Sequence, residues 1–175
     1  MKPLKQVGQS YLALIDGERQ LQQSLFEDAA ATYRRAMEVS RTIPQDEAFD
    51  YDGFDAIAHT GLSCALVKLE RYPETLESTE IALRYFNRRG ELNQDEGKQW
   101  IDAVYSRAVA LDGVGRFDES LKAFRMVGEM IAERKGDMKN KEELQQAVVQ
   151  FINKVESALS GKKPADYKAW WEFWA

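Results

Sequence analysis

Two side chains in this 175-residue chain are of types that often do chemistry, a single histidine and a single cysteine five positions apart. A histidine can act as a base, or bind a metal with a partner three or four positions along a helix. After His59 those positions hold Leu62 and Ser63, and Cys64 lies at nearly the wrong angle for joint ligation. We also see no catalytic set of a nucleophile, a base and a group that orients the base, and a single histidine disfavours a Ser-His or Cys-His arrangement. We expect no catalytic residue and no metal, with His59 structural and Cys64 a buried or groove-wall thiol.

The stretch DEAFDYDGFD, residues 46–55, carries five carboxylates and faintly resembles a calcium loop. An EF-hand loop needs a glycine at its sixth position and a glutamate at its twelfth, and neither falls in place. We expect a solvated loop that caps the next helix. Arg84, Arg88 and Arg89 cluster late in a predicted helix, where cations favour the C-terminal end. A contact to a phosphate or an acidic partner is the alternative for these arginines.

Composition narrows the class of protein further. The net charge of −5 argues mildly against non-specific binding to nucleic acid. One cysteine allows no internal disulfide and fits a cytoplasmic setting. Asp16, Glu18 and Arg19 interrupt the apolar residues near the N-terminus, and no stretch approaches the roughly 20 apolar residues of a membrane span. The two glycine-rich patterns that bind nucleotide phosphates, G-x-x-x-x-G-K-[ST] and G-x-G-x-x-G, do not occur in the sequence. We therefore expect no cofactor, and we expect a cytoplasmic protein.

The elements that position these residues form a repeat. Three stretches share a turn residue, an aromatic, an acidic residue and then apolar or small residues on helical spacing. They are SLFEDAAATY (24–33), ERYPETLEST (70–79) and GRFDESLKAF (115–124). Their aromatic residues, Phe26, Tyr72 and Phe117, recur at intervals of 46 and 45. The acidic residue in each suits the first turn of a helix, where the helix dipole favours negative charge.

Apolar residues at helical spacing before and after each turn predict paired helices. No alternating pattern of useful length indicates a strand. We predict an all-α fold of three helix–turn–helix units, over about 8–42, 54–89 and 95–135, and a capping helix over about 140–159. Residues 1–160 would then form one helical repeat domain, and 161–175 a separate aromatic-rich tail.

This pattern resembles the tetratricopeptide repeat (TPR) family. The third unit matches that family best, in Ala108, Gly115, Phe117, Ser120 and Phe124. The resemblance implies a TPR-like right-handed superhelix of three pairs with a C-terminal capping helix. The spacing of about 45 departs from the usual 34 and lengthens the helices and loops. The segment from "YFNRRGELNQ" to "ALDGVGR" also resembles small bacterial TPR-like proteins.

The resemblance also implies a concave face, lined by the first helix of each pair, that binds a peptide. The groove positions are held by Tyr11, Leu14, Glu18, Gln22, Ile57, Thr60, Cys64, Lys68, Asp102, Tyr105, Ser106, Val109 and Asp112. TPR domains that grip two carboxylates use a clamp of Lys, Arg and Asn, whereas Lys68 stands alone here. We therefore expect an apolar ligand with a basic group, or an amphipathic helix. The alternative is a superhelix too short for an open groove, in which some of these positions face the core.

The C-terminal stretch KKPADYKAWWEFWA is dense in aromatic residues, which usually marks an interface. Its aromatics are Tyr167, Trp170, Trp171, Phe173 and Trp174. The tail could fold onto its own repeat stack, or dock into a neighbouring copy to make a homodimer. An anchor to a membrane surface or a partner is the least favoured alternative, because only Lys162 and Lys163 beside the aromatics support it.

Two functional hypotheses follow from these residues. The first is a non-catalytic interaction module that binds a protein or peptide partner on its concave face. The second is a self-assembling, homo-oligomeric structural protein whose groove holds its own or a neighbour's aromatic tail. Neither hypothesis includes nucleic acid or membrane attachment.

Overall fold

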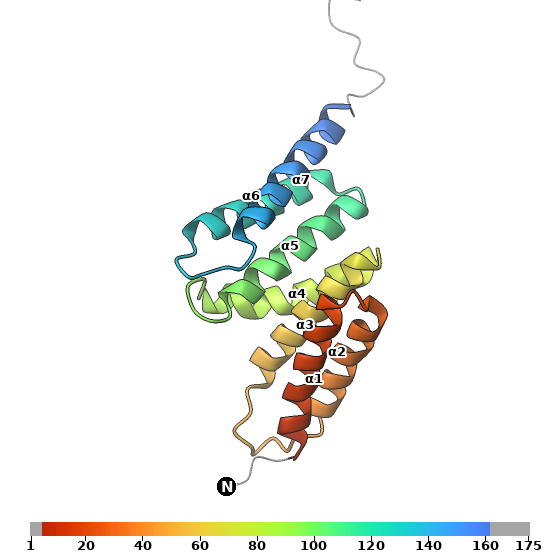
Figure 1. The fold of residues 1–175 in the computed structure, drawn as a ribbon, viewed down its shortest axis with the longest axis vertical. Helices are drawn as coiled ribbons and strands as arrows, with labels where there is room; N and C mark the ends of the chain where they lie inside the picture. The colour runs from red at the N-terminus through yellow and green to blue at the C-terminus, as the bar shows by residue number, and fades with distance from the viewer. Residues whose placement is uncertain (1–4, 162–175) are drawn as a thin grey trace, which may run out of the picture.

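The computed structural model describes residues 5–161, which form seven α-helices and no strand (Figure 1). The helices are α1 (Lys5–Gln22), α2 (Phe26–Ser40), α3 (Tyr51–Lys68), α4 (Tyr72–Arg89), α5 (Gly97–Gly113), α6 (Phe117–Glu133) and α7 (Lys141–Gly161). The three predicted pairs and the capping helix are confirmed, and their ends lie within three residues of the predicted ones. The fold is an all-α helical repeat.

The turn inside each helix pair has the same backbone geometry. The residues at the three equivalent turn positions, Ser24, Glu70 and Gly115, have positive φ values of 60°, 57° and 78°. At each turn the next amide donates to a carbonyl five residues back, at 2.8 Å from Arg116 N to Leu111 O in the third pair. This is the Schellman motif, which satisfies carbonyl groups that a helix end leaves unpaired. One repeated turn therefore makes one repeated hairpin of helices.

The aromatic residues that revealed the repeat occupy equivalent places. Phe26, Tyr72 and Phe117 are the first residues of α2, α4 and α6. The residue before each has φ between −86° and −87° and ψ between 62° and 66°. The Tyr72 ring lies against Gly113 so closely that a β-carbon on this glycine would overlap it. This aromatic therefore joins the second pair to the third.

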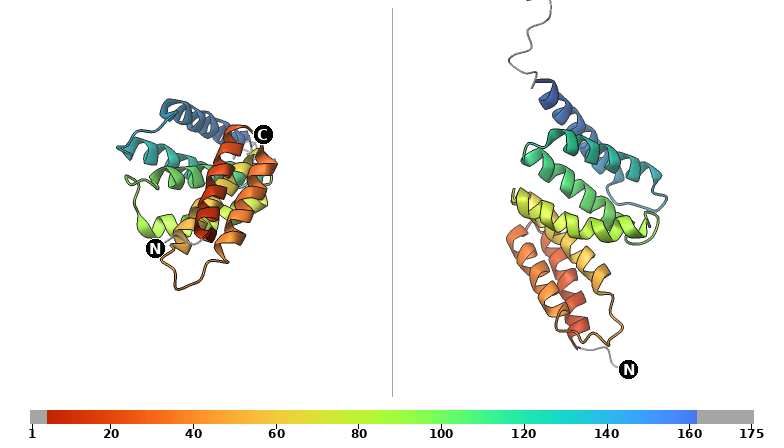
Figure 2. Two further views of the ribbon diagram at one scale, coloured as in Figure 1. Left: turned by 60° about the horizontal axis from the view of Figure 1, so that its bottom comes forward. Right: turned by 180° about the vertical axis from the view of Figure 1, so that it is seen from behind.

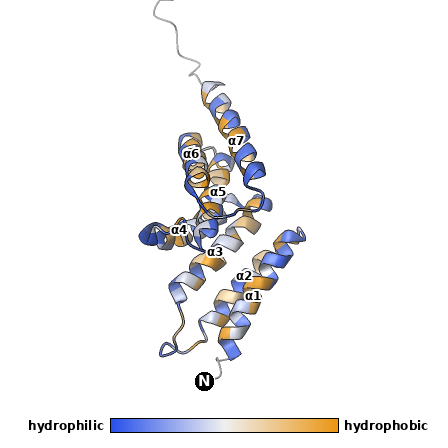
Figure 3. Cartoon of the chain, turned by 60° about the vertical axis from the view of Figure 1, so that its left-hand side comes forward, coloured by the Kyte–Doolittle hydropathy of each residue, from blue (hydrophilic) through white to orange (hydrophobic). Residues whose placement is uncertain are grey.

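The helix pairs stack along the long axis of the molecule, with α1 and α2 near one end and α7 at the other (Figures 1 and 2). Each helix packs against the next in the chain, and α3 also packs against both α1 and α5. Hydrophilic and hydrophobic residues alternate along α1 and α7 (Figure 3). Buried apolar residues of neighbouring pairs pack against one another, as a repeat stack requires.

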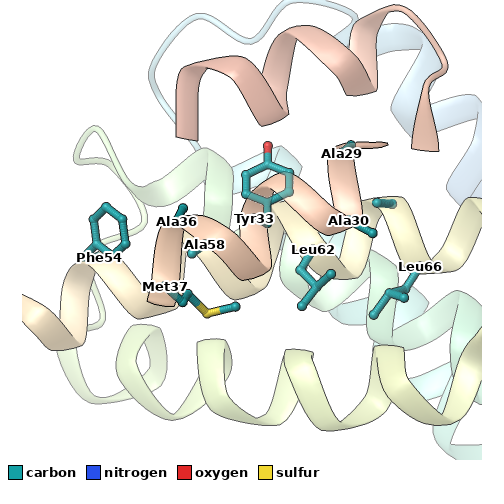
Figure 4. Close-up of a cluster of buried hydrophobic side chains, with 10 residues drawn as sticks. Ala29, Ala30, Tyr33, Ala36, Met37, Phe54, Ala58, Leu62 and Leu66 are labelled. Carbon is teal, nitrogen blue, oxygen red and sulfur yellow. The ribbon is translucent and has the colours of Figure 1, made fainter. Parts of the chain in front are cut away.

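The core is divided among the layers of the stack. Phe54, Leu62 and Leu66 of α3 pack with buried residues of α2 in one cluster (Figure 4). Phe124 and Ile131 of α6 pack with buried residues of α5 and α7 in another. A smaller cluster joins α3, α4 and α5. No layer has a core of its own that excludes its neighbours.

An arginine fixes the connection between the second and third pairs. The Arg134 guanidinium, just past the end of α6, donates from Nη1 to the carbonyls of Leu92 at 2.5 Å and Gln94 at 3.1 Å. The amide of Lys135 donates to Asn93 Oδ1 at 2.8 Å. The connection between α4 and α5 is thus held against the third pair.

The turn geometry predicts different effects on stability for substitutions at two equivalent turn positions. Gly115→Ala should lower the free energy of unfolding by about 1 kcal/mol, because a β-carbon is disfavoured at positive φ. Glu70→Gly should cause no loss, because it relieves that strain at the equivalent position. Urea denaturation of both variants measures these effects, with Gly136→Ala, at a loop glycine without positive φ, as the control. Equal losses in Gly115→Ala and Glu70→Gly would contradict the shared turn geometry.

Candidate functional site

The predicted groove residues lie on the first helices of the pairs, α1, α3 and α5, but differ in exposure. Four are exposed, namely Tyr11, Glu18, Gln22 and Lys68. Seven are half-buried, namely Leu14, Ile57, Cys64, Asp102, Tyr105, Val109 and Asp112. α3 contacts both α1 and α5, so the three helices that carry these residues adjoin one another. We call the surface formed by these helices the concave face, after the shape that the resemblance implies.

Thr60 and Ser106 are corrections to this set. Their exposed fractions are only 3% and 2%, so neither presents its side chain to a ligand. Thr60 Oγ1 donates to the carbonyl of Ala56 within its own helix at 2.8 Å. The Ser106 hydroxyl lies 3.6 Å from Cys64 Sγ on α3. Both residues are small enough to sit where α3 and α5 approach each other, and their contribution is to packing.

The capping helix α7 covers the last part of the predicted groove. Asp112 pairs with Lys154 of α7 at 2.5 Å, and its side chain is 8% exposed. The Tyr105 ring packs edge-on against Phe124 and Phe151. Asp112 is therefore occupied by an ion pair within the chain, and the open part of the concave face lies towards α1 and the start of α5.

Tyr33 of α2 reaches this open part from behind. The tip of its ring lies against glycines of two other helices, and a β-carbon on Gly17 of α1 would lie 2.8 Å from the ring. A β-carbon on Gly61 of α3 would lie 2.6 Å from the hydroxyl oxygen. Figure 4 shows the hydroxyl pointing away from Leu62 and Leu66. Two glycines thus leave a gap through which a residue of the second helix reaches the face of the first helices.

The Tyr33 hydroxyl meets an acidic environment. Burial raises the pKa of Tyr33, and Cys64, Glu18 and Asp102 raise it further. Burial also raises the pKa of Asp102 to about 6, with a further rise from Glu18 and an opposing effect of Lys98. Four helices therefore bring together a hydroxyl, a thiol and two carboxyl groups. Neither Glu18 nor Asp102 forms an ion pair with any residue in the range 5–161.

The two residues of chemically active type lack the surroundings of a catalytic pair. Burial raises the pKa of the Cys64 thiol to about 12, which keeps it in the weakly nucleophilic protonated form. Burial lowers the pKa of His59, and its Nδ1 is enclosed without a hydrogen-bond partner. This histidine is a neutral, half-buried residue, which agrees with the structural role predicted for it.

The acidic loop caps a helix. Asp50 Oδ1 accepts a hydrogen bond from the amide of Gly53 at 3.0 Å, which satisfies a free donor at the start of α3. Asp52 pairs with Arg88 of α4 at 3.3 Å. Within the described residues, no group of three or more potential metal ligands occurs. The loop therefore serves to join the second pair together.

The predicted basic cluster is likewise engaged inside the chain. Arg88 pairs with Asp52, Arg89 pairs with Glu91 at 2.7 Å, and Arg84 lies 3.7 Å from Glu80. These pairs support the structural interpretation of the cluster.

Sequence reasoning missed three residues of the concave face. Ile15, which is 62% exposed, lies one turn from Tyr11 and one turn from Glu18 on α1, and this spacing could have identified it. Lys98 lies one turn before Asp102 on α5, and this helical spacing could have identified it too. Tyr33 lies on the second helix of its pair, and nothing in one sequence pairs it with Gly61.

The predicted tail interface, Tyr167, Trp170, Trp171, Phe173 and Trp174, lies outside the described residues. Among the helices that are described, none is long and apolar enough to cross a membrane.

The close contact between Tyr33 and Gly61 predicts that an alanine at position 61 destabilises the protein, although alanine favours helices. Gly61→Ala should lower the free energy of unfolding by about 1–3 kcal/mol, because the added methyl overlaps the Tyr33 ring and overpacks the site. Gly128→Ala on α6 is the matched control. Its added methyl meets its nearest neighbour at 3.8 Å, so the better helix propensity of alanine should make it neutral or stabilising. Similar stabilisation in both variants would contradict the close contact.

The buried carboxyl group predicts a pH-dependent difference in stability. The folded pKa of Asp102, about 6, lies above the ~3.9 of an unfolded chain, so folding favours the protonated acid. Its stabilisation is complete below about pH 4 and is lost as pH rises through 6. Relative to Asp102→Asn, the wild type should therefore lose stability between pH 4 and pH 7 in urea titrations. A constant difference between the two proteins across this range would contradict the raised pKa.

Comparisons with known proteins agree with this architecture. A family model described as Domain of Unknown Function (DUF3856) matches residues 2–144. No curated protein matches the chain. The crystal structure of a TPR-like protein from Chlorobium tepidum is 54% identical in sequence, with a TM-score of 0.86 over 89% of this chain and 99% of that one. The chain therefore belongs to the DUF3856 family and has a TPR-like helical repeat fold.

Proposed function

We propose that this protein is a non-catalytic interaction module that binds a segment of a partner protein on its concave face. One observation carries the proposal, namely that α1 exposes apolar and acidic side chains together on this face. Tyr11 and Ile15 are 46% and 62% exposed, and the carboxylate of Glu18, one turn further along, has no ion-pair partner among residues 5–161. Exposed apolar residues beside unpaired polar groups are typical of interaction surfaces.

The composition of this face indicates the kind of segment that fits it. Tyr11, Ile15, Ile57 and Val109 offer apolar surface along α1, α3 and α5. Lys68 is the only basic residue among the predicted groove positions, so a clamp for two carboxylates has no support. A segment with apolar side chains and few acidic ones matches this surface best.

The chemistry of the buried residues supports binding over catalysis. Burial holds Cys64 as a thiol, and His59 is neutral, with its Nδ1 enclosed and without a hydrogen-bond partner among the described residues. A catalytic base must lie within hydrogen-bond reach of the proton that it takes. We place the protein in the cytoplasm, where an unpaired cysteine such as Cys64 is stable.

Self-assembly through the tail is the second candidate function. The specific observation in its favour is chemical complementarity between the tail sequence and the concave face. Residues 162–175 carry three lysines and five aromatic residues. The face carries apolar side chains and two carboxyl groups that form no ion pair with any other described residue. A neighbouring copy could therefore supply the bound segment.

Site-specific photo-crosslinking in the native cell tests the proposed function. A photoreactive phenylalanine analogue at Ile15 should form crosslinks to a defined segment of a partner. The same analogue at Met126, which is 39% exposed on α6, should not crosslink to that segment. Mass spectrometry identifies the segment, and competition with the matching synthetic peptide should abolish the Ile15 crosslink.

The outcomes separate the two candidates. Crosslinks from Ile15 to residues 162–175 of a second copy would favour self-assembly. The same partner captured equally from Ile15 and Met126 would contradict binding on the concave face.

A further inference from the structure

We propose that the concave face holds a binding site for a lysine or arginine side chain of a partner protein, formed by the carboxyl groups of Glu18 and Asp102 and the hydroxyl of Tyr33. The inference rests on the proposed function and specifies the chemistry that the same face recognises. The three residues come from α1, α5 and α2, so only the assembled stack can form the site.

The Tyr33 hydroxyl is the first observation that points to a ligand. The residue is only 4% exposed, yet its hydroxyl makes no hydrogen bond with any described residue. The hydroxyl oxygen is not fully enclosed by the described residues. A buried tyrosine usually finds a partner for its hydroxyl. Gly17 and Gly61 leave the space that brings this one to the concave face, where a ligand can pair with it.

The charges around this hydroxyl determine the class of ligand. Glu18 directly follows Gly17, which lies against the Tyr33 ring. Asp102 lies one turn before Ser106, whose hydroxyl is 3.6 Å from Cys64 Sγ, and Cys64 lies one turn after Gly61, the other glycine against that ring. In agreement with this placement, both carboxyl groups raise the pKa of Tyr33, and Glu18 raises the pKa of Asp102. Two neighbouring carboxyl groups without an ion pair repel each other, and a cation between them removes this cost. Lys98 lies close enough to affect Asp102 but does not form an ion pair with it. Among the described residues, Lys98 is thus a nearby cation, but no cation pairs with either carboxyl group, so a ligand can supply that partner.

The surroundings of the site favour a side chain on a peptide over a free ion. Tyr11 and Ile15 on α1 provide exposed apolar surface within two turns of Glu18. Ile57 and Val109 continue this surface on α3 and α5. The stems of lysine and arginine are apolar and pack on such surfaces while their charged ends reach polar groups. Within the described residues, no metal-ligand cluster competes for this role.

Peptide pools bound to the full chain test the proposal. The probes are fluorescent nonapeptide pools with a fixed central Lys, Arg, Gln or Glu and random flanking residues. At pH 7.5 we expect the Lys and Arg pools to bind about tenfold or more tightly than the Gln and Glu pools, which corresponds to about 1.4 kcal/mol. Fluorescence anisotropy measures the affinities.

Substitutions locate the preference. Glu18→Gln with Asp102→Asn should abolish the cation preference and leave the affinity of the Gln pool unchanged. Asp118→Asn with Glu129→Gln changes the net charge equally on exposed residues of α6, and should retain the preference. Tyr33→Phe removes only the hydroxyl and should weaken the Lys pool several-fold. If the double variant fails to fold by circular dichroism, Glu18→Gln alone carries the test, because Glu18 is exposed.

The pH dependence gives an independent readout. The groups that face Asp102 are Glu18 from α1, Tyr33 from α2, Cys64 from α3 and Lys98 on its own helix. The Lys pool should bind more weakly at pH 5 than at pH 7.5, because Asp102 becomes protonated through pH 6. Asp102→Asn should reduce this difference. Lys98→Gln should strengthen binding, since it removes a nearby positive charge.

The results that overturn the proposal are distinct. If the pools bind without a cation preference, and Ile15→Glu weakens them, the cation site is wrong and the proposed function stands. A second protein for this test is a tail variant with Lys162, Lys163 and Lys168 all changed to Gln. If no pool binds to the wild type or to this tail variant, the cation site and the proposed function are both wrong. If only this tail variant binds the Lys pool, the chain's own tail occupies the site, which overturns the assignment to a partner protein.

Discussion

No helix pair of this protein can bury its apolar residues alone, and the rest of the structure depends on this constraint. Each pair has one side that packs on the previous pair and one that packs on the next, so the core is shared across layers. A stack built in this way has first helices that line one face and second helices that line the other. The concave face therefore exists because of the packing, and its residues come together from segments far apart in the sequence.

The second helices nevertheless contribute to the face of the first. The Tyr33 ring lies against both Gly17 and Gly61, so it stabilises the junction of α1, α2 and α3, while its hydroxyl has no hydrogen-bond partner among the described residues. One side chain thus contributes to packing and, in the proposed site, to binding. The same junction places Glu18 near Asp102, whose raised pKa shows how strongly burial affects a carboxyl group at this position.

Periodic features were predictable from the sequence because they rest on local rules. The turns at Ser24, Glu70 and Gly115 and the helix starts at Phe26 and Tyr72 follow from spacing that repeats every 45 or 46 residues. Contacts between helices were less predictable, because one sequence does not state which helix faces which. Thr60 and Ser106 share the periodicity of the groove residues, yet the approach of α3 to α5 buries them. Asp112 was assigned to an open groove, and α7 covers it because Lys154 lies opposite.

Hydrogen–deuterium exchange of the full chain, followed by mass spectrometry, tests the shared core most directly. The account predicts that amides of α3 exchange most slowly, because α3 contacts α1, α2, α4 and α5. Protection should fall towards α1 at one end and α7 at the other, since each of these helices has neighbours on one side only. Equal protection in the three pairs, or slowest exchange in α1 or α7, would contradict a stack whose layers depend on one another.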